Sequence, residues 1–447
     1  MLSPTFPTTG FGWIRSAVAA AWPSCWRNRC RLSLNAMQTM IAPGSAVRTG
    51  LFGNAASRVL TRHTQRMRFT RASARHDQAA RSQRIDYLDG IRGVAVVAVI
   101  CSHWLSAYTP LGGGGYIGVT AFFVLSGYVI TSVLWRKRIG YWAFLGNRVR
   151  RLYPALLGLL IVGVALTAVV PASAVHPGVA IKWAAVAAVQ AMAPWAIAHF
   201  QTEHNLFAVT WSLAIEWYFY IAWAAVLLAL KRSEARTAEI AKGALATGGV
   251  LWLVSLLLPD AWSYFGPVSN SGALLVGCAL AIWVFERPTP PDWWSARTAS
   301  WVSFLGLGAA AAWTLVGGSK YDYPYRVSVL PLTCALTVLL IVGGRWAPTS
   351  APSLLLSWRP VAGLGRVSYS LYLWHTIPLL VMTGSTLPVP RPVIGAVGVA
   401  AAAALTWVSF VMLERPFMRS RASSLGGPSR RDQKAQARIG SSAGART

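Results

Sequence analysis

Residues 116–138 read YIGVTAFFVLSGYVITSVLWRKR, in which twenty uncharged and mostly apolar residues run directly into three bases. A helix rises about 1.5 Å per residue, so about twenty residues cross the roughly 30 Å hydrocarbon core of a bilayer. Bases that directly follow a spanning helix mark its cytoplasmic end. The stretch therefore predicts a membrane-spanning helix that runs from the outer face to the cytoplasm.

Similar apolar runs recur along the chain and decide its class. Of the 447 residues, 55% are hydrophobic and only 12% are charged, with a mean hydropathy of +0.47. Soluble domains carry about 25% charged residues. We predict an all-α polytopic membrane protein. Its candidate spans are the apolar runs 91–108, 116–135, 152–170, 178–198, 211–230, 243–258, 271–285, 299–316, 327–343, 364–383 and 393–413.

The charge is strongly basic, with 41 Lys and Arg residues against 13 Asp and Glu and a formal net charge of +28. Because the bases cluster in tails and in short loops between apolar runs, we interpret them as topology signals and expect no nucleic-acid partner. They place the loops at 136–151 and 231–242 in the cytoplasm. An even number of crossings must separate these loops, yet three apolar runs lie between them.

The run at 178–198 is the weakest of the three, because it contains Lys182, Gln190 and Pro194. We predict a re-entrant or interfacial segment there, since irregular backbone survives at membrane depth only when it packs in protein or lines a cavity. About ten transmembrane helices remain, with both termini in the cytoplasm.

The two ends of the chain differ from its centre. Residues 1–84 and 419–447 are basic and show no sustained apolar face, so we predict two disordered cytoplasmic tails around a membrane domain at 85–418. Translation could start at Met1 or at Met67. The five cysteines form no CxxC pair, so we expect no metal site.

Ionisable side chains inside apolar runs are few, and such residues usually face the interior of a helix bundle. Glu216 is the acid well inside a run, and His103 and His375 are histidines in similar positions. Arg92 stands at the predicted cytoplasmic mouth of its helix. His103 follows eleven residues later, about three turns and roughly 16 Å along the same face. The run at 91–108 is predicted to go from the cytoplasm outward, so His103 lies in its outer half. The run at 211–230 is predicted to go inward, so Glu216, near its start, lies at a similar depth.

A histidine beside a carboxylate in a low-dielectric site is suited to act as a general base with an orienting partner. The alternative is a structural hydrogen bond between two helices, worth about 0.6 kcal/mol. Residue chemistry alone leaves both interpretations open for His103 and Glu216.

Two bases in the cytoplasmic loop are candidates for ligand contact. Arg148 and Arg151 lie one helical turn apart, and arginine pairs with phosphate in a bidentate way. The other interpretation is that these bases only set the topology.

Ser126 lies within the run at 116–135. As a nucleophile it would need a base within reach, whereas Ser126 and Gly127 together would allow close helix packing. Glu414 and Arg415, at the end of the last run, predict a helix stop with a local ion pair.

Six segments in this order resemble the membrane-bound acyltransferase 3 family, which includes O-acetyltransferases of bacterial surface polysaccharides and peptidoglycan. The resemblance covers roughly residues 84–418. The matching segments are YLDGIRGVAVVAVICSH, GYIGVTAFFVLSGYVIT, RVRRLYPAL, TWSLAIEWYFY, GRVSYSLYLWH and MLERP.

The resemblance implies roles for particular residues. The family's arginine-and-histidine motif falls on Arg92 and His103, which it implies are needed for acyl transfer together with Glu216. Its other motifs fall on Arg148 and Arg151, for donor binding, and on Trp211 and Ser212. The candidates for lining the site are Ser126, Trp211, Ser212, Tyr369 and His375, all within the matching segments.

The implied activity is transfer of an acyl group, foremost acetyl, from cytoplasmic acyl-CoA to a hydroxyl of a carbohydrate or lipid-linked acceptor. Acyl-CoA is then a co-substrate, no cofactor is permanently bound, and the setting is the bilayer of the bacterial cytoplasmic membrane. A proton-coupled transporter of a small molecule is the alternative, since intramembrane His and Glu also suit a proton relay. A non-catalytic assembly or sensor protein is a third interpretation. The acceptor, the acyl chain length, the oligomeric state and the choice between direct transfer and an acyl-enzyme stay open.

Overall fold

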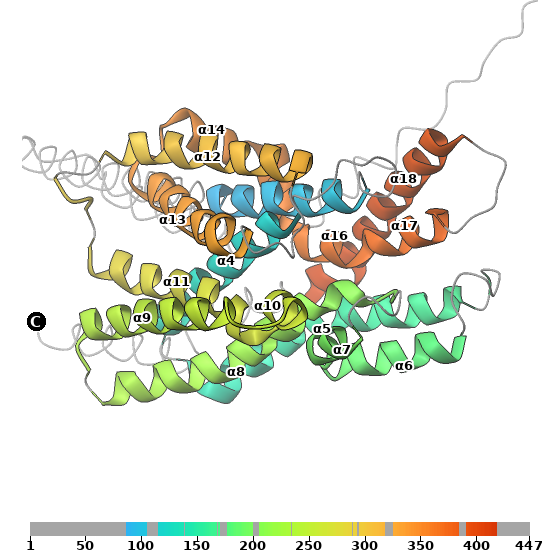
Figure 1. Cartoon of the computed structure of the whole chain (residues 1–447), viewed down its shortest axis with the longest axis horizontal. Coiled ribbons are helices and arrows are strands. Elements are labelled where there is room, and N and C mark those ends of the chain that lie inside the picture. Colours follow the sequence, from blue (N-terminus) through green and yellow to red (C-terminus); the bar gives the residue numbers. More distant parts are fainter. Residues whose placement is uncertain are drawn as a thin grey trace, which may run out of the picture. The chain divides into compact units, whose positions relative to one another are not determined.

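The computed structural model describes residues 86–417 except for short gaps, so the predictions for the tails lie outside the described residues. The regular elements in the described part are helices, without a β-strand, which confirms the predicted all-α class (Figure 1). The gaps are 105–114, 138, 168, 170–176, 200–204, 234, 288, 293–294, 318–324 and 384–389.

The first described helix covers residues 86–104. The later α-helices are α4 Gly115–Arg136, α5 Tyr141–Leu166, α6 Pro177–Ala188, α7 Met192–Ala198, α8 Trp211–Arg232, α9 Thr237–Ser255, α10 Asp260–Phe265, α11 Pro267–Glu286, α12 Ala296–Gly317, α13 Leu330–Trp346, α14 Ala351–Leu356, α15 Arg359–Arg366, α16 Ser368–Trp374, α17 Thr376–Thr383 and α18 Arg391–Ser409.

Six helical segments of the described chain are both long and apolar enough to cross a membrane. They are Gly115–Arg136, Tyr141–Leu166, Ala208–Arg232, Asp260–Glu286, Arg326–Trp346 and Pro392–Phe417. The helix at 86–104, α9 and α12 are also long but do not belong to these six. A polytopic membrane protein is therefore confirmed, whereas the predicted count of about ten spans is not.

The run at 178–198 breaks into two helices, neither of which is long enough to span a bilayer. The break falls at Gln190, whose φ of 60° lies in the left-handed region. Its backbone oxygen accepts a hydrogen bond from the Tyr218 hydroxyl at 2.6 Å, which ties the break to α8. The expectation that this run is no continuous span is confirmed.

The run at 364–383, a candidate span, is not one continuous helix in the structure. The structure divides this region among α15, α16 and α17, with breaks at Val367 and His375. Pro378 explains the second break, because it lacks an N–H for the carbonyl of Trp374 and its ring crowds that carbonyl. His375 therefore lies at a joint between two short helices.

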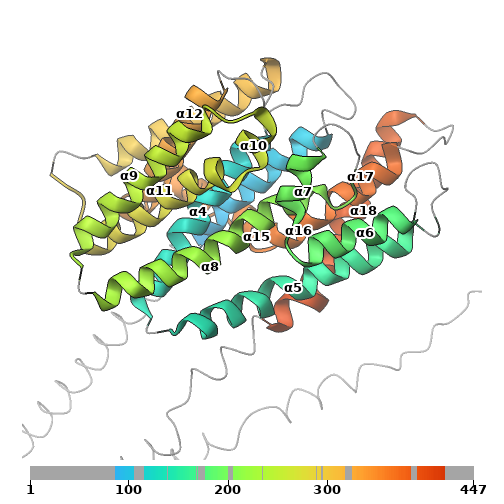
Figure 2. The ribbon, with the colours of Figure 1, turned by 60° about the horizontal axis from the view of Figure 1, so that its bottom comes forward.

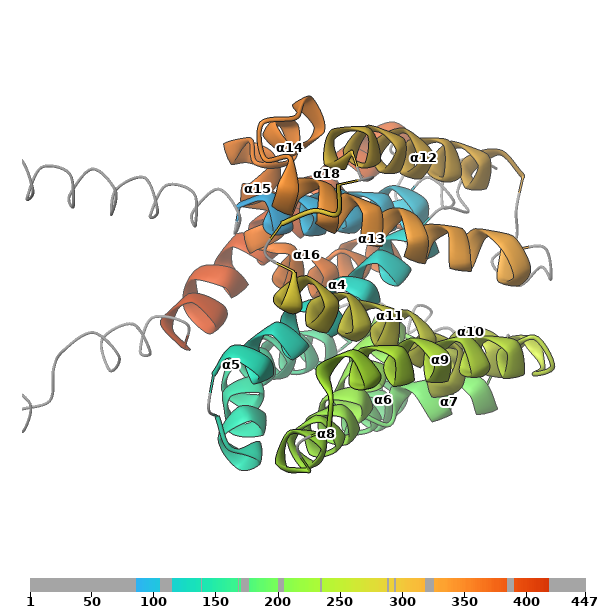
Figure 3. The ribbon, with the colours of Figure 1, turned by 90° about the vertical axis from the view of Figure 1, so that its left-hand side faces the viewer.

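A close backbone contact joins α4 to α11. A Cβ atom on Gly127 would lie 1.9 Å from the backbone oxygen of Leu274, and one on Gly277 would lie 2.0 Å from that of Val124. The two backbones thus touch where each helix has a glycine, as predicted for Gly127. Figures 2 and 3 show α11 between α4 and α9, which are its main partners.

The predicted ion pair between Glu414 and Arg415 is wrong. α18 passes into a π-helical turn, Phe410–Glu414, and helix continues to Phe417. Glu414 is 1% exposed and accepts a hydrogen bond from Ser370 Oγ at 2.9 Å. Arg415 is exposed, and the described ion pairs do not join it to Glu414. The wider π-helical turn directs Glu414 inward towards α16.

Candidate active site

A cavity of about 120 Å³ lies among five helices: 86–104, α4, α5, α8 and α16. Its apolar wall comes mainly from α4, including Val119, Phe122 and Phe123. Its polar lining residues are Arg92, Ser126, Arg148, Arg151, Ser212, Glu216, Tyr220, Ser368, Tyr369 and Tyr372.

Helical spacing explains why these side chains converge. Ser212, Glu216 and Tyr220 follow one another at intervals of four residues, so they share one face of α8. Arg148 and Arg151 lie three residues apart on α5 and also share a face. The cavity therefore receives one polar row from each of these helices.

The carboxylate of Glu216 is held by two hydroxyl groups. Ser126 Oγ donates a hydrogen bond to Oε1 at 2.5 Å, and the Tyr220 hydroxyl donates to Oε2 at 2.5 Å. Both bonds are as short as charge-assisted hydrogen bonds usually are. Glu216 therefore has a fixed orientation, set by α4 and by the next turn of its own helix.

Three arginines line the same cavity. The Arg148 guanidinium lies over the rings of Phe144 and Tyr220, 5.3 Å from each centroid. Arg151 lies near enough to Arg92 for their charges to repel each other. An arrangement of three cations and one carboxylate in a partly buried site attracts anions.

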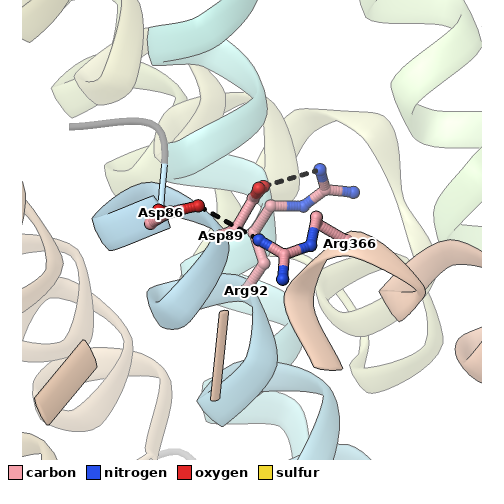
Figure 4. A network of polar contacts seen from close by, with 4 residues as sticks. All are labelled: Asp86, Asp89, Arg92 and Arg366. Carbon is pink, nitrogen blue, oxygen red and sulfur yellow. Dashed lines mark hydrogen bonds and ion pairs between the residues drawn. The ribbon is translucent and has the colours of Figure 1, made fainter. Parts of the chain in front are cut away.

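Arg92 is held at the start of the helix at 86–104. It forms an ion pair with Asp89 at 3.9 Å, beside a second pair between Arg366 on α15 and Asp86 at 3.0 Å (Figure 4). The Arg92 side chain is 26% exposed. This network joins the first turn of the helix to α15 at one edge of the cavity.

Two polar atoms in the cavity wall lack a hydrogen-bond partner within the described part of the chain. They are Nε of Arg151 and Oγ of Ser368, and both atoms are buried. Buried polar groups are normally satisfied by protein, water or ligand. The wall is therefore suited to a ligand that carries oxygen acceptors.

His103 and His375 lie outside this cavity and contact each other. Nε2 of His375 is 3.2 Å from Nδ1 of His103, and the two ring centroids are 5.0 Å apart. His375 is fully buried, whereas His103 is exposed. Glu216 lines the cavity and has hydrogen bonds with Ser126 and Tyr220, whereas His103 lies outside it beside His375, so the predicted pairing of His103 with Glu216 is wrong.

A family model described as an acyltransferase domain, that of acyltransferase 3, matches residues 85–412. The chain belongs to the acyltransferase 3 family. The match begins just before the helix at 86–104 and ends in the π-helical turn, so it includes every helix that lines the cavity.

Three bacterial relatives are similar to this member of the acyltransferase 3 family. The peptidoglycan O-acetyltransferase OatA of Listeria monocytogenes is 29% identical over 356 residues, covering 74% of this chain and 56% of that protein. The putative peptidoglycan O-acetyltransferase YrhL of Bacillus subtilis is 30% identical over 328 residues, covering 68% and 50%. The O-acetyltransferase OatA of Staphylococcus aureus is 30% identical over 326 residues, covering 67% and 51%.

The chain spans about half the length of these curated relatives. No solved structure matches it.

The structure brings most of the predicted site residues into the cavity and leaves three outside. Those outside are His103, His375 and Trp211. Trp211 packs instead against the rings of Tyr264 and Phe265, with centroids 5.1 Å away in each case. The predicted residues that line the cavity are Arg92, Ser126, Arg148, Arg151, Ser212, Glu216 and Tyr369.

Sequence reasoning missed the cavity residues Tyr220 and Tyr372, and it gave Glu414 only a structural role at a helix end. A signal existed for the two tyrosines, because Tyr220 lies four residues after Glu216 and Tyr372 three residues after Tyr369. Glu414 is acted on by the charges of Arg92 and Arg151. Its inward direction depends on a π-helical turn, which helical periodicity does not reveal.

Proposed function

We propose that this protein is an integral membrane O-acyltransferase that moves an acyl group, foremost acetyl, from cytoplasmic acyl-CoA to a hydroxyl of a carbohydrate acceptor. The observation that carries the proposal is the cavity that Arg92, Arg148 and Arg151 line together with the hydrogen-bonded pair of Glu216 and Ser126. Membership of the acyltransferase 3 family supports the reaction type.

The charge of the cavity supports coenzyme A as the donor. Coenzyme A carries several phosphate charges, and arginine binds phosphate oxygens in a bidentate way. The unpartnered Nε of Arg151 and Oγ of Ser368 would find acceptors on such a ligand. The basic loop at 136–151 supports a cytoplasmic position for this end of the cavity.

The names of the relatives support a carbohydrate acceptor, since they describe O-acetyltransferases and, in two cases, peptidoglycan. In the proposed reaction, His103 takes the proton of the acceptor hydroxyl, and the oxygen bonds to the thioester carbonyl carbon. The carbon–sulfur bond breaks, and the departing thiolate takes the proton from His103. Glu216 lines the donor cavity, where hydrogen bonds from Ser126 and Tyr220 fix its position.

The test uses membrane vesicles that contain the full chain, acetyl-labelled acetyl-CoA and soluble peptidoglycan oligosaccharides. We expect label on the oligosaccharide that mild base releases as acetate, as an O-ester requires. Transfer that does not depend on acetyl-CoA, or the absence of any label, would overturn the proposal.

A matched pair of variants tests the donor site. Arg151→Ala removes a cavity arginine, whereas Arg150→Ala removes an exposed arginine from the same helix. We expect Arg151→Ala to raise the KM for acetyl-CoA at least about tenfold, because a hydrogen bond to a charged group contributes about 1.5–3 kcal/mol. Arg150→Ala should leave that KM within about twofold, as is usual for surface charges. Equal effects of the two variants would contradict the assignment.

A further inference from the structure

Two backbone carbonyl groups, one beside each ring, determine where the protons of His103 and His375 lie. Nδ1 of His375 is 2.7 Å from the backbone oxygen of Tyr372, and Nδ1 of His103 is 3.0 Å from that of Val99. A carbonyl oxygen can only accept a hydrogen bond, so each Nδ1 must carry a hydrogen. The two carbonyls therefore select the same tautomer in both neutral rings.

The direction of the bond between the rings follows from these two protons. In neutral His375 the proton is on Nδ1, so Nε2 carries the lone pair. That lone pair faces the Nδ1–H of His103 at 3.2 Å and accepts from it. A proton on His375 Nε2 would place two N–H donors against each other, so His375 is suited to remain neutral.

We propose that His375 is the positioning residue of His103, which it holds in the tautomer whose basic nitrogen is Nε2. This inference rests on the proposed function, in which His103 takes the proton of the acceptor hydroxyl. The series from the Tyr372 carbonyl through His375 to His103 does the work that an orienting carboxylate does for a catalytic histidine. His375 thus takes the place of Glu216, which one interpretation of the sequence made the orienting partner of His103.

The geometry also suits the proton transfer itself. When Nε2 of His103 gains a proton, its Nδ1–H keeps two acceptors, the Val99 carbonyl and His375 Nε2. The imidazolium is thus stabilised without any rearrangement. In the described residues, His103 is the one ionisable group whose charge acts on His375, and Tyr372 is the other titratable side chain in ring contact with it, at 5.8 Å.

Tyr372 connects this pair to the donor cavity. Its side chain lines the cavity, and its hydroxyl lies 2.8 Å from Ser212 Oγ and donates to the Val209 carbonyl at 3.0 Å. Its backbone oxygen holds His375. One residue on α16 therefore fixes the wall of the donor cavity and the orientation of the two histidines.

Two substitutions separate the two bonds of His375. His375→Gln can present its amide oxygen where Nε2 stands and so keeps the acceptor for His103. His375→Asn can present its amide nitrogen where Nδ1 stands, which keeps the donor to Tyr372 but loses that acceptor. If His375 had only a structural role, His375→Asn, which keeps the bond to the Tyr372 carbonyl, should be the more active of the two variants.

We measure acetyl transfer from acetyl-CoA to peptidoglycan oligosaccharides in vesicles, with His103→Ala as the inactive reference. His375→Asn should lower kcat at least about tenfold, as part of the 10²–10⁴-fold contribution of a general base. Its KM for acetyl-CoA should stay unchanged, because the arginine cavity is intact. His375→Gln should keep kcat within about threefold of the wild type, since it keeps the acceptor.

The tautomer is read independently of activity from the ¹⁵N spectrum of the histidine-labelled full chain in lipid bilayers. We expect an unprotonated Nε2 for His103 in the wild type and in His375→Gln, and a mixture of tautomers in His375→Asn. A protonated Nε2 in neutral wild-type His103, or His375→Asn with wild-type kcat, overturns the inference. Wild-type protein that shows this tautomer but transfers no acetyl, or an active His103→Ala, overturns the proposed function instead.

Discussion

Ser126 on α4 donates a hydrogen bond from Oγ to Oε1 of Glu216 on α8 at 2.5 Å, inside the cavity that the arginines line. This bond joins two helices whose residues lie 90 positions apart in the chain. Together with the bond from Tyr220, it fixes Glu216, the one carboxylate among the described residues that line this cavity. Glu216 therefore has a fixed position in the wall of this cavity, which the proposed function makes the donor side of the site.

The first prediction separates binding from catalysis at Glu216. Glu216→Gln removes the negative charge from the cavity, which cannot weaken the attraction of a polyanionic donor. We expect kcat to fall at least about tenfold while the KM for acetyl-CoA does not rise, as for a group that acts mainly in the transition state. Initial rates in vesicles at varied acetyl-CoA give both constants. If Glu216→Gln instead raised the KM for acetyl-CoA about tenfold, as expected for Arg151→Ala, the result would contradict this position for Glu216.

The second prediction concerns Ser126, whose hydroxyl has a base within reach. In direct transfer, Ser126→Ala removes one donor from Glu216, so we expect a slower but active enzyme, with a loss of about 1.5–3 kcal/mol in transition-state stabilisation. Rates are compared with Tyr220→Phe, which removes the other donor. Complete loss of transfer in Ser126→Ala alone, with stable acetyl label on Ser126 of the wild type, would establish an acyl-serine intermediate instead.

The site was predictable to the extent that it depends on helical periodicity. Arg148 and Arg151 share a face of α5 because they are three residues apart. Ser212 and Glu216, four residues apart, likewise share the face of α8 that lines the cavity. The partners of His103 were not predictable in this way. They depend on the break at His375, which Pro378 causes, and on how α16 packs beside the helix at 86–104.

The fold could likewise be predicted only in part. Apolar runs identify the helix class and the glycine contact at Gly127, whereas hydropathy cannot distinguish a continuous span from short helices in one apolar run. Depth arguments place His103 and Glu216 by distance along an axis. They carry no information about rotation about that axis, so they could not exclude different partners.

The third prediction tests the contact between α4 and α11. Gly127→Ala adds a methyl group 1.9 Å from the Leu274 backbone oxygen, which cannot move without a shift of the helix. We expect the free energy of unfolding to fall by about 1–3 kcal/mol, the usual cost of overpacking. Gly249→Ala on α9 is the control, because its methyl group meets nothing within 4 Å of the described atoms. It should stabilise the helix by up to about 1 kcal/mol. Thermal unfolding in detergent that ranks the two variants in the opposite order would contradict this packing.

The last prediction concerns Glu414, which the π-helical turn directs into the protein. It is buried, accepts a hydrogen bond from Ser370, and interacts electrostatically with Arg92 and Arg151. Glu414→Gln can keep an acceptor for Ser370 but leaves the two arginines with less opposite charge. We expect the protein without donor to lose roughly 1–3 kcal/mol of unfolding free energy, as when a buried polar group loses its partner.

Added acetyl-CoA should raise the unfolding temperature of Glu414→Gln more than that of the wild type, because the donor phosphates supply the missing negative charge to the arginines. The control is Glu239→Gln on α9, whose carboxylate is 62% exposed beside Lys242. An exposed ion pair contributes only about 0–1 kcal/mol, so this variant should unfold like the wild type with and without donor. Equal donor-induced shifts in Glu414→Gln and the wild type would show that Glu414 does not balance the charge of the donor site.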